Sequence, residues 1–232
     1  MVSVMLRNSN RVVTAPARSA SRATKLSAVN SRAQDLSPTA FRERILDAAE
    51  ACLIDVGYSP RLHAQIAERA GLSRPTVYKY VGDQTAIFEA LFQREITRFF
   101  AVLDPVLRGR DQLHVGFVDC IVFAVCYARR HTMLQKALRD DPDIVLPWFT
   151  VRARPLIERG ADFLVPHFER LFTPQQLVAV SPRAICEWAF RLVASLIVTE
   201  GVVDTADEAA VRGFVGGLLS IAVVPATDAR VV

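Results

Sequence analysis

The stretch AGLSRPTVYKY, which runs from Ala70 to Tyr80, joins the end of one helical pattern to the start of another. Gly71 supplies the positive φ angle that a tight turn between two crossed helices requires. Ser73 is the expected N-cap, and Pro75 costs no hydrogen bond because first-turn N–H groups have no partner within a helix. The stretch therefore predicts a helix-turn-helix with Val77 pointing inward.

Apolar residues recur at spacings of three and four on both sides of this stretch, which is typical of helices rather than strands. The pattern predicts helices over residues 38–56, 60–70 and 84–103, with Ser59 and Pro60 starting the second of these. Further helices follow from residue 112, with breaks at Pro147, Pro155 and Pro166. We expect an all-α chain with a domain boundary inside residues 100–111, where Pro105 and Gly109 interrupt the pattern.

The 232 residues carry a formal net charge of +4, and the excess lies at the N-terminus. Residues 1–36 hold six cations against the single anion Asp35, in a segment rich in Ser, Ala and Arg. Such a segment cannot bury enough apolar surface to order itself, so we expect a disordered basic leader that can touch DNA phosphates. The alternatives are a solvated tail, or residues added by an upstream start codon.

Several functional classes find no support in the sequence. No apolar run is long enough for a membrane span, and four scattered cysteines indicate a reducing cytoplasm rather than a disulfide framework. The four histidines share no metal-ligand spacing, and no nucleophile elbow, phosphate loop or dinucleotide fingerprint is present. We therefore expect no metal, no cofactor and no catalytic site.

The outward face of the helix that begins after Ser73 suits DNA. Arg74 and Lys79 can donate to guanine, and Thr76 or Pro75 can touch a thymine methyl group. Hydroxyl groups such as that of Tyr78 suit phosphate oxygens, and Tyr80 should be partly packed. The alternative is an ordinary helical hairpin with a solvated polar face.

Two segments, RILDAAEACLIDVGY (residues 44–58) and IAERAGLSRPTVYKYVGDQTAIFEAL (residues 66–91), resemble the N-terminal domain of the TetR (tetracycline repressor) family. The resemblance implies a homodimer with an N-terminal three-helix DNA-binding domain, here residues 37–103, and a larger helical effector-binding and dimerisation domain, here residues 104–232. The chain departs from the family's pattern at Val81, usually Phe, and at Gln84, usually a Lys that contacts phosphate. By position, the implied DNA-binding residues are Arg61, His63, Ser73, Arg74, Pro75, Thr76, Tyr78, Lys79 and Tyr80.

The two last predicted helices, near residues 182–200 and 205–223, carry apolar stripes and closely spaced glycines that suit a two-fold four-helix interface. The alternative is packing within one chain. The residues expected in the interface are Ile185, Leu192, Leu196, Phe214, Gly217 and Leu218.

Bulky apolar residues with a few polar neighbours in the second half are candidates for an effector pocket. The alternative is that the aromatic residues form the core and the histidines lie on the surface. The candidates are His114, Phe117, Asp119, Phe123, Tyr127, Trp148, Phe163, His167 and Trp188.

Together these patterns predict a cytoplasmic homodimeric repressor that binds a palindromic operator in double-stranded DNA. It would leave that operator when a mainly apolar small molecule enters the C-terminal domain. One alternative is an enzyme or carrier for an apolar ligand with a vestigial DNA-binding domain. Another is a structural, sequence-independent DNA binder that relies on the basic leader.

Overall fold

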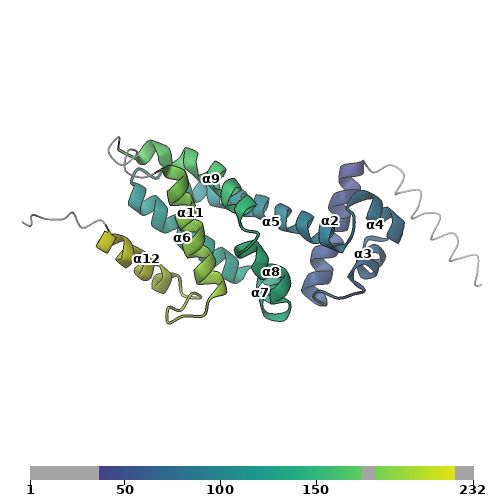
Figure 1. The fold of residues 1–232 in the computed structure, drawn as a ribbon. Coiled ribbons are helices and arrows are strands. Elements are labelled where there is room, and N and C mark those ends of the chain that lie inside the picture. The colour runs from purple at the N-terminus through teal and green to yellow at the C-terminus, as the bar shows by residue number, and fades with distance from the viewer. Residues whose placement is uncertain (1–36, 174–180, 223–232) are drawn as a thin grey trace, which may run out of the picture.

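The computed structural model describes residues 37–173 and 181–222, and every regular element among them is a helix (Figure 1). The all-α fold class predicted from the sequence is confirmed. The predicted basic leader lies outside the described residues. The helices are α2 (Pro38–Asp55), α3 (Leu62–Ala70), α4 (Arg74–Tyr80), α5 (Gln84–Leu107), α6 (Leu113–Arg130), α7 (Thr132–Asp140), α8 (Pro142–Phe149), α9 (Arg154–Phe168), the short 3-10 helix η1 (Glu169–Leu171), α11 (Pro182–Val198) and α12 (Glu208–Ala222).

The N-terminal helices α2, α3 and α4 pack around one apolar core that also includes the start of α5. Ile45, Ile66 and Val77 contribute fully buried side chains from the first three helices. Gly71 ends α3 with a φ of 63°, and a Cβ at this position would lie 2.9 Å from an Arg44 guanidinium nitrogen. The tight turn predicted from Gly71 is therefore confirmed, because its backbone angle favours a residue without a side chain, whereas the flexible end of Arg44 could move aside.

The second helix starts later than the sequence predicts. Its first residue is Leu62, and the preceding residue Arg61 makes no side-chain capping bond. Ser59 and Pro60 instead form a turn, in which the Leu62 N–H donates to the Ser59 carbonyl oxygen at 3.0 Å. The Ser59 hydroxyl accepts from the Arg61 N–H and also bonds the side chain of Gln65. The hydroxyl thus braces the entry to α3 from outside the helix.

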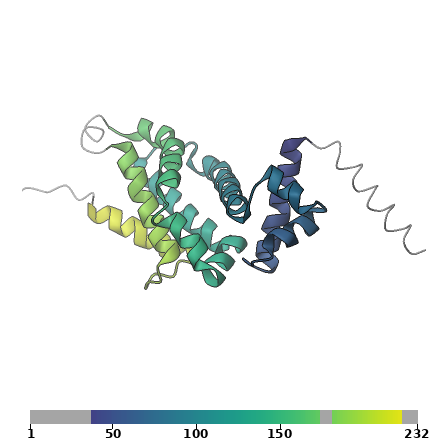
Figure 2. The same ribbon diagram turned by 45° about the vertical axis from the view of Figure 1, so that its right-hand side comes forward.

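Helix α5 is longer than predicted and continues through Pro105 to Leu107. The proline removes one hydrogen-bond donor near the helix end. The burial of Leu103 and Leu107, each at most 2% exposed, offsets this cost. The domain boundary predicted between residues 103 and 104 falls inside this helix, which joins the two groups of helices as one rod (Figures 1 and 2).

The second group of helices is built around α6. Ile121 and Val125 of α6 are fully buried and pack in one cluster with Val211 and Val215 of α12. Pro147 and Pro166 lie inside α8 and α9, so the breaks predicted at these two prolines are wrong. Pro155 lies in the first turn of α9, close to the break between α8 and α9. Among the described helices, none is both long and apolar enough to cross a membrane.

Candidate DNA interface and effector cavity

The N-terminus of α4 is fixed by a side-chain cap. The Ser73 hydroxyl oxygen accepts from the Thr76 N–H at 3.2 Å and lies 2.7 Å from the Thr76 hydroxyl. Pro75 sits in the first turn, where no intrahelical bond is lost. The Ser73 and Thr76 hydroxyl groups thus bond each other, and these contacts stabilise the first turn of α4.

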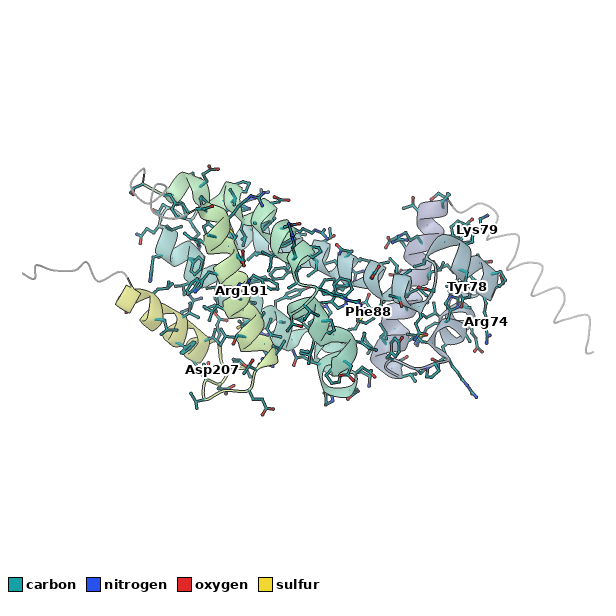
Figure 3. All side chains as sticks on the ribbon, in the orientation of Figure 1. Arg74, Tyr78, Lys79, Phe88, Arg191 and Asp207 are labelled. Carbon is teal, nitrogen blue, oxygen red and sulfur yellow. The ribbon has the colours of Figure 1, made fainter. Side chains whose placement is uncertain are left out.

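The outer face of α4 carries its charged side chains. Arg74, Pro75 and Lys79 are exposed, and Tyr78 is 54% exposed. Figure 3 shows Arg74, Tyr78 and Lys79 at the end of the molecule farthest from α12. Tyr80 lies on the other side of α4, half-buried, with its ring stacked on Phe41 at a centroid distance of 4.7 Å. Arg74, Tyr78 and Lys79 are therefore exposed to solvent, whereas Tyr80 packs against α2 and supports α4.

His63 does not face outward as the sequence suggested. Its side chain is buried, its ring stacks on Tyr78 at 3.9 Å, and its Nε2 lies 3.3 Å from the Gly82 carbonyl oxygen. A buried ring cannot present its nitrogens to a DNA phosphate, whereas Arg61, two residues earlier, is exposed. The stack places His63 beneath the Tyr78 ring as a support.

The start of α5 is tied to the same surface through a residue that differs from the family's pattern. The Gln84 amide donates to the Ser59 carbonyl oxygen at 3.0 Å, and so links α5 to the loop before α3. Val81 is buried in the core beside α4. Both departures from the usual pattern thus have a structural role here.

Residues 45–91, which extend from α2 into α5, match the model of the bacterial regulatory proteins of the tetR family. The chain is 29% identical over 174 residues to MT1294, an uncharacterised HTH-type transcriptional regulator of Mycobacterium tuberculosis, covering 72% of this chain and 79% of the relative. It is 27% identical over 139 residues to the HTH-type transcriptional repressor Rv1474c of the same organism, covering 59% of this chain and 67% of that one.

The chain is a TetR-family transcriptional regulator. Regulators of this family bind DNA and ligands and form dimers. Among the solved structures that share the fold of this TetR-family regulator are two named regulators. AlkX of Dietzia, a TetR-family repressor implicated in the biodegradation of n-alkanes, has a TM-score of 0.56 at 21% identity and covers 78% of this chain and 91% of its own. The fatty acid degradation regulator FadR of Bacillus halodurans has a TM-score of 0.53 at 17% identity and covers 77% and 93%.

In this TetR-family regulator, an apolar cavity of about 190 Å³ lies among α5, α6, α7, α8, α9 and α11. Two of the nine residues proposed from the sequence, Tyr127 and Trp148, line it. Most of the aromatic lining comes instead from residues outside these nine. These are Phe88, Phe92, Phe99, Phe100, Phe149 and Phe190.

Asp119 and Phe123 face a second, more polar cleft of about 510 Å³ on the other side of α6. Asp119 is buried and pairs with Arg110 at 2.9 Å and Arg212 at 2.6 Å, so its charge is neutralised inside the protein. Tyr127 lines both cavities. The sequence could not assign Asp119 to this cleft, because Arg212 lies 93 residues away along the chain.

The other five proposed pocket residues lie outside both cavities. Phe163 stacks on Phe100 behind the cavity wall, and His167 pairs with Asp104 at 3.3 Å. His114 is exposed. Phe117 stacks on Trp188, whose own side chain is 46% exposed. These residues contribute to packing or to the surface rather than to the cavity.

The residues proposed for the dimer interface fall into two groups. Ile185, Leu192 and Leu196 are partly buried against the cluster formed by α6 and α12, so they pack at least partly within the chain. Phe214, Gly217 and Leu218 of α12 are exposed. An apolar outer face of α12 is thus left open in this chain.

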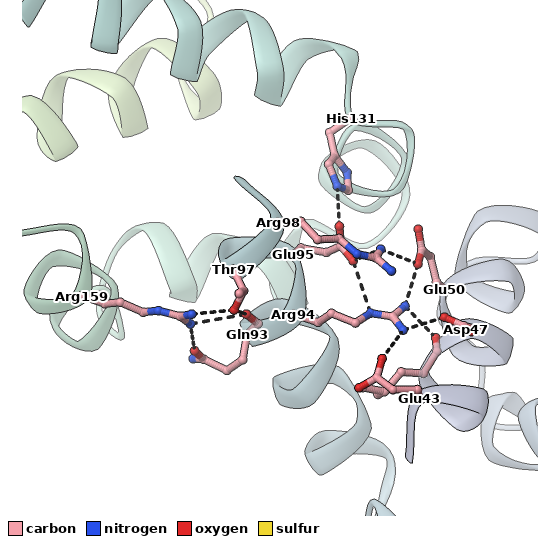
Figure 4. A network of polar contacts seen from close by, with 11 residues as sticks. Glu43, Asp47, Glu50, Gln93, Arg94, Glu95, Thr97, Arg98, His131 and Arg159 are labelled. Atoms are coloured by element: carbon pink, nitrogen blue, oxygen red, sulfur yellow. Dashed lines mark hydrogen bonds and ion pairs between the residues drawn. The ribbon is translucent and has the colours of Figure 1, made fainter. Parts of the chain in front are cut away.

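A polar network starts at Glu95, one of the residues that line the apolar cavity (Figure 4). The His131 Nδ1 accepts from the Leu134 N–H at 3.2 Å, so the neutral ring carries its proton on Nε2 and donates to Glu95 at 3.2 Å. Burial acts to raise the pKa of Glu95, but the hydrogen bond from His131 and the charges of Arg98 and Arg94 outweigh it, so this pKa lies below its ordinary value. Glu95 is therefore an ionised group at the edge of an apolar cavity.

The network continues from Glu95 to the DNA-binding helices. Arg98 bonds Glu95 at 2.7 Å and Glu50 of α2 at 3.0 Å. Arg94, whose side chain is only 10% exposed, bonds Glu50 at 2.6 Å and Asp47 at 2.7 Å. Helix α5 thus carries both a cavity wall and the cations that hold α2, which gives a physical route from one site to the other.

Proposed function

We propose that this regulator is a homodimeric repressor, acting in the cytoplasm, which leaves a palindromic operator when a mainly apolar small molecule enters the cavity. The observation that carries the proposal is the position of α5. Its aromatic residues line the cavity, and its Arg94 holds the first DNA-binding helix. A ligand that shifts α5 would change the angle at which α4 is presented to DNA.

In this proposal α4 enters the major groove with its exposed face. Arg74 and Lys79 donate to guanine bases, and Pro75 and the methyl group of Thr76 meet thymine methyl groups. The Tyr78 hydroxyl contacts a phosphate from a ring that His63 holds in place. Ser73 contributes mainly by capping the helix. Tyr80 acts through its stack on Phe41.

Two further features support a DNA-bound dimer. Arg61 is exposed before α3, so its guanidinium group is free to reach a phosphate. The open apolar face of α12 around Phe214 and Leu218 is suited to a second copy of the chain, which would place two α4 helices at half-sites about one helical turn apart.

The lining of the cavity supports an apolar effector, since aromatic and aliphatic side chains make up almost all of it. Two neighbours in fold, a repressor implicated in n-alkane biodegradation and a fatty acid degradation regulator, agree with that chemistry.

A gel-shift titration of the purified protein on DNA from its own promoter region, at a stated salt concentration, tests the proposal. We expect a shift that an effector reverses. A protein that shifts no such fragment, with or without candidate effectors, would be incompatible with a repressor. An enzyme or carrier with a vestigial DNA-binding domain would keep its ligand affinity and show no operator binding.

A further inference from the structure

Three of the residues that line the apolar cavity have polar side chains and lie close to one another. They are Glu95 of α5, Tyr127 of α6 and His131, which directly follows α6. A ligand that fills the cavity can place one polar group against these residues, while its remainder meets aromatic and aliphatic side chains. The volume of about 190 Å³ is below the ~300–1,000 Å³ typical of sites for drug-sized ligands, which favours a slender molecule.

The hydrogen-bonding capacity left on Glu95 and His131 is that of an acceptor. Both ring nitrogens of His131 already have partners. The Glu95 carboxylate has about four acceptor positions. Two of them take the bonds from His131 and Arg98, while the Arg94 Nε lies farther off at 3.6 Å. Glu95 can therefore accept a further donor without losing a partner.

Tyr127 adds a group that can complete such a site. Its hydroxyl makes no hydrogen bond to any other residue in the part of the chain that the structure describes. Burial and the nearby charge of Glu95 raise the pKa of Tyr127, so it stays a neutral hydroxyl. It can donate to, or accept from, a ligand group that reaches Glu95 and His131.

The local charge favours a donor over an anion. Four carboxylates meet two guanidinium groups in the network, so it carries a net negative charge. The groups are Glu43, Asp47, Glu50, Glu95, Arg94 and Arg98. A carboxylate on the ligand would be repelled here, whereas a protonated amine would be attracted.

From this arrangement we infer that the cavity takes an elongated apolar molecule with a hydrogen-bond donor at one end, a protonated amine or a hydroxyl group, bound to Glu95. The inference rests on the proposed effector role of the cavity and names the chemistry of the effector. An apolar chain alone would leave the acceptor capacity of Glu95 unused. A fatty acid would bring a second negative charge to it.

Isothermal titration calorimetry of the full chain, without DNA, with three ten-carbon probes tests the inference. The probes are 1-decylamine, 1-decanol and decanoic acid, which differ only in the head group. We expect affinity to fall in that order, with the amine at least about tenfold tighter than the acid because its bond to Glu95 is between charged groups. Equal binding of the amine and the acid, or tighter binding of the acid, would overturn the inference.

A pair of variants assigns the preference to one side chain. Glu95→Gln should remove the amine's advantage over the acid, because it keeps the shape but not the charge. Asp47→Asn should preserve the advantage, because this network carboxylate does not line the cavity. An amine preference that persists in Glu95→Gln would reject the assignment. If Glu95→Gln does not fold, the ranking of the probes on the unaltered protein still decides the question.

This experiment is independent of the repressor proposal. An amine that binds in the calorimeter but does not release the operator counts against the proposed release mechanism and leaves the head-group assignment standing. A protein that shifts operator DNA but binds the acid best overturns the head-group assignment and leaves the repressor proposal standing.

Discussion

Replacing Arg94 with methionine removes a shielded guanidinium group and keeps a long side chain of similar reach. Two of its hydrogen bonds are shielded, to Glu50 at 2.6 Å and to the Leu46 carbonyl oxygen at 3.2 Å. At about 1.5 kcal/mol for each bond made by a charged donor, they contribute about 3 kcal/mol. The partners Glu43 and Asp47 are 52% and 68% exposed and add little. We expect Arg94→Met to lower the free energy of unfolding by about 3 kcal/mol.

Urea denaturation at neutral pH, followed by circular dichroism, measures this loss as a lower midpoint with an unchanged slope. Arg98→Met is the matched control, because Arg98 lies one helical turn away in the same network but is 45% exposed. It should cost about 1 kcal/mol or less. Equal losses in the two variants would refute the reasoning that burial makes Arg94 the principal link to α2.

Further predictions concern DNA binding, backbone conformation and pH. Lys79→Ala should weaken operator binding by about 1–3 kcal/mol in a gel-shift titration at fixed salt, with an unchanged melting temperature because Lys79 is exposed. Gly71→Ala should lower the free energy of unfolding by about 1 kcal/mol or more, because the backbone φ there is 63°. Gly160→Ala should raise the free energy of unfolding by about 0.5–1 kcal/mol, because Gly160 lies in helix α9 and a Cβ added there meets no neighbouring element within 4 Å. If the two glycine variants shift the melting temperature in the same direction, these two predictions are wrong. Because the folded pKa of Glu95 lies below its ordinary value of 4.5, its stabilising contribution is complete above that pH and is lost as the pH falls through the folded pKa. Melting temperatures recorded across that range should converge for the unaltered protein and Glu95→Gln as the solution is acidified.

The helix-turn-helix could be predicted in detail because local chemistry specifies it. The left-handed turn at Gly71, the cap at Ser73 and the inward position of Val77 each depend on residues a few positions apart. The start of α3 was predicted two residues early, because a Ser-Pro pair can brace a turn as well as cap a helix. The end of α5 was missed for a related reason, since the packing of Leu107 outweighs the break expected at Pro105.

The cavity could be predicted only in its general chemistry. The sequence indicated an apolar pocket with few polar groups, but most of the proposed residues lie elsewhere. Glu95 and His131 are 36 residues apart and Arg94 and Asp47 are 47 apart, so only the packing of α5 against α2 and α6 brings these groups together. His63 was assigned to DNA on its position in α3, and the stack on Tyr78 that buries it depends on how α3 and α4 cross.

The continuity of α5 has a consequence for how the protein unfolds. Ile87 and Leu91 belong to the core of the DNA-binding helices, whereas Leu103 and Leu107 belong to a core shared with α9 and α11. One helix of 24 residues, about 36 Å long, therefore contributes to both cores. If the C-terminal core melts, the distal half of α5 loses its packing and frays toward Arg94. The DNA-binding helices and the ligand-binding helices should therefore unfold in a single transition, and a fragment cut after residue 103 would end in an apolar helix without a partner.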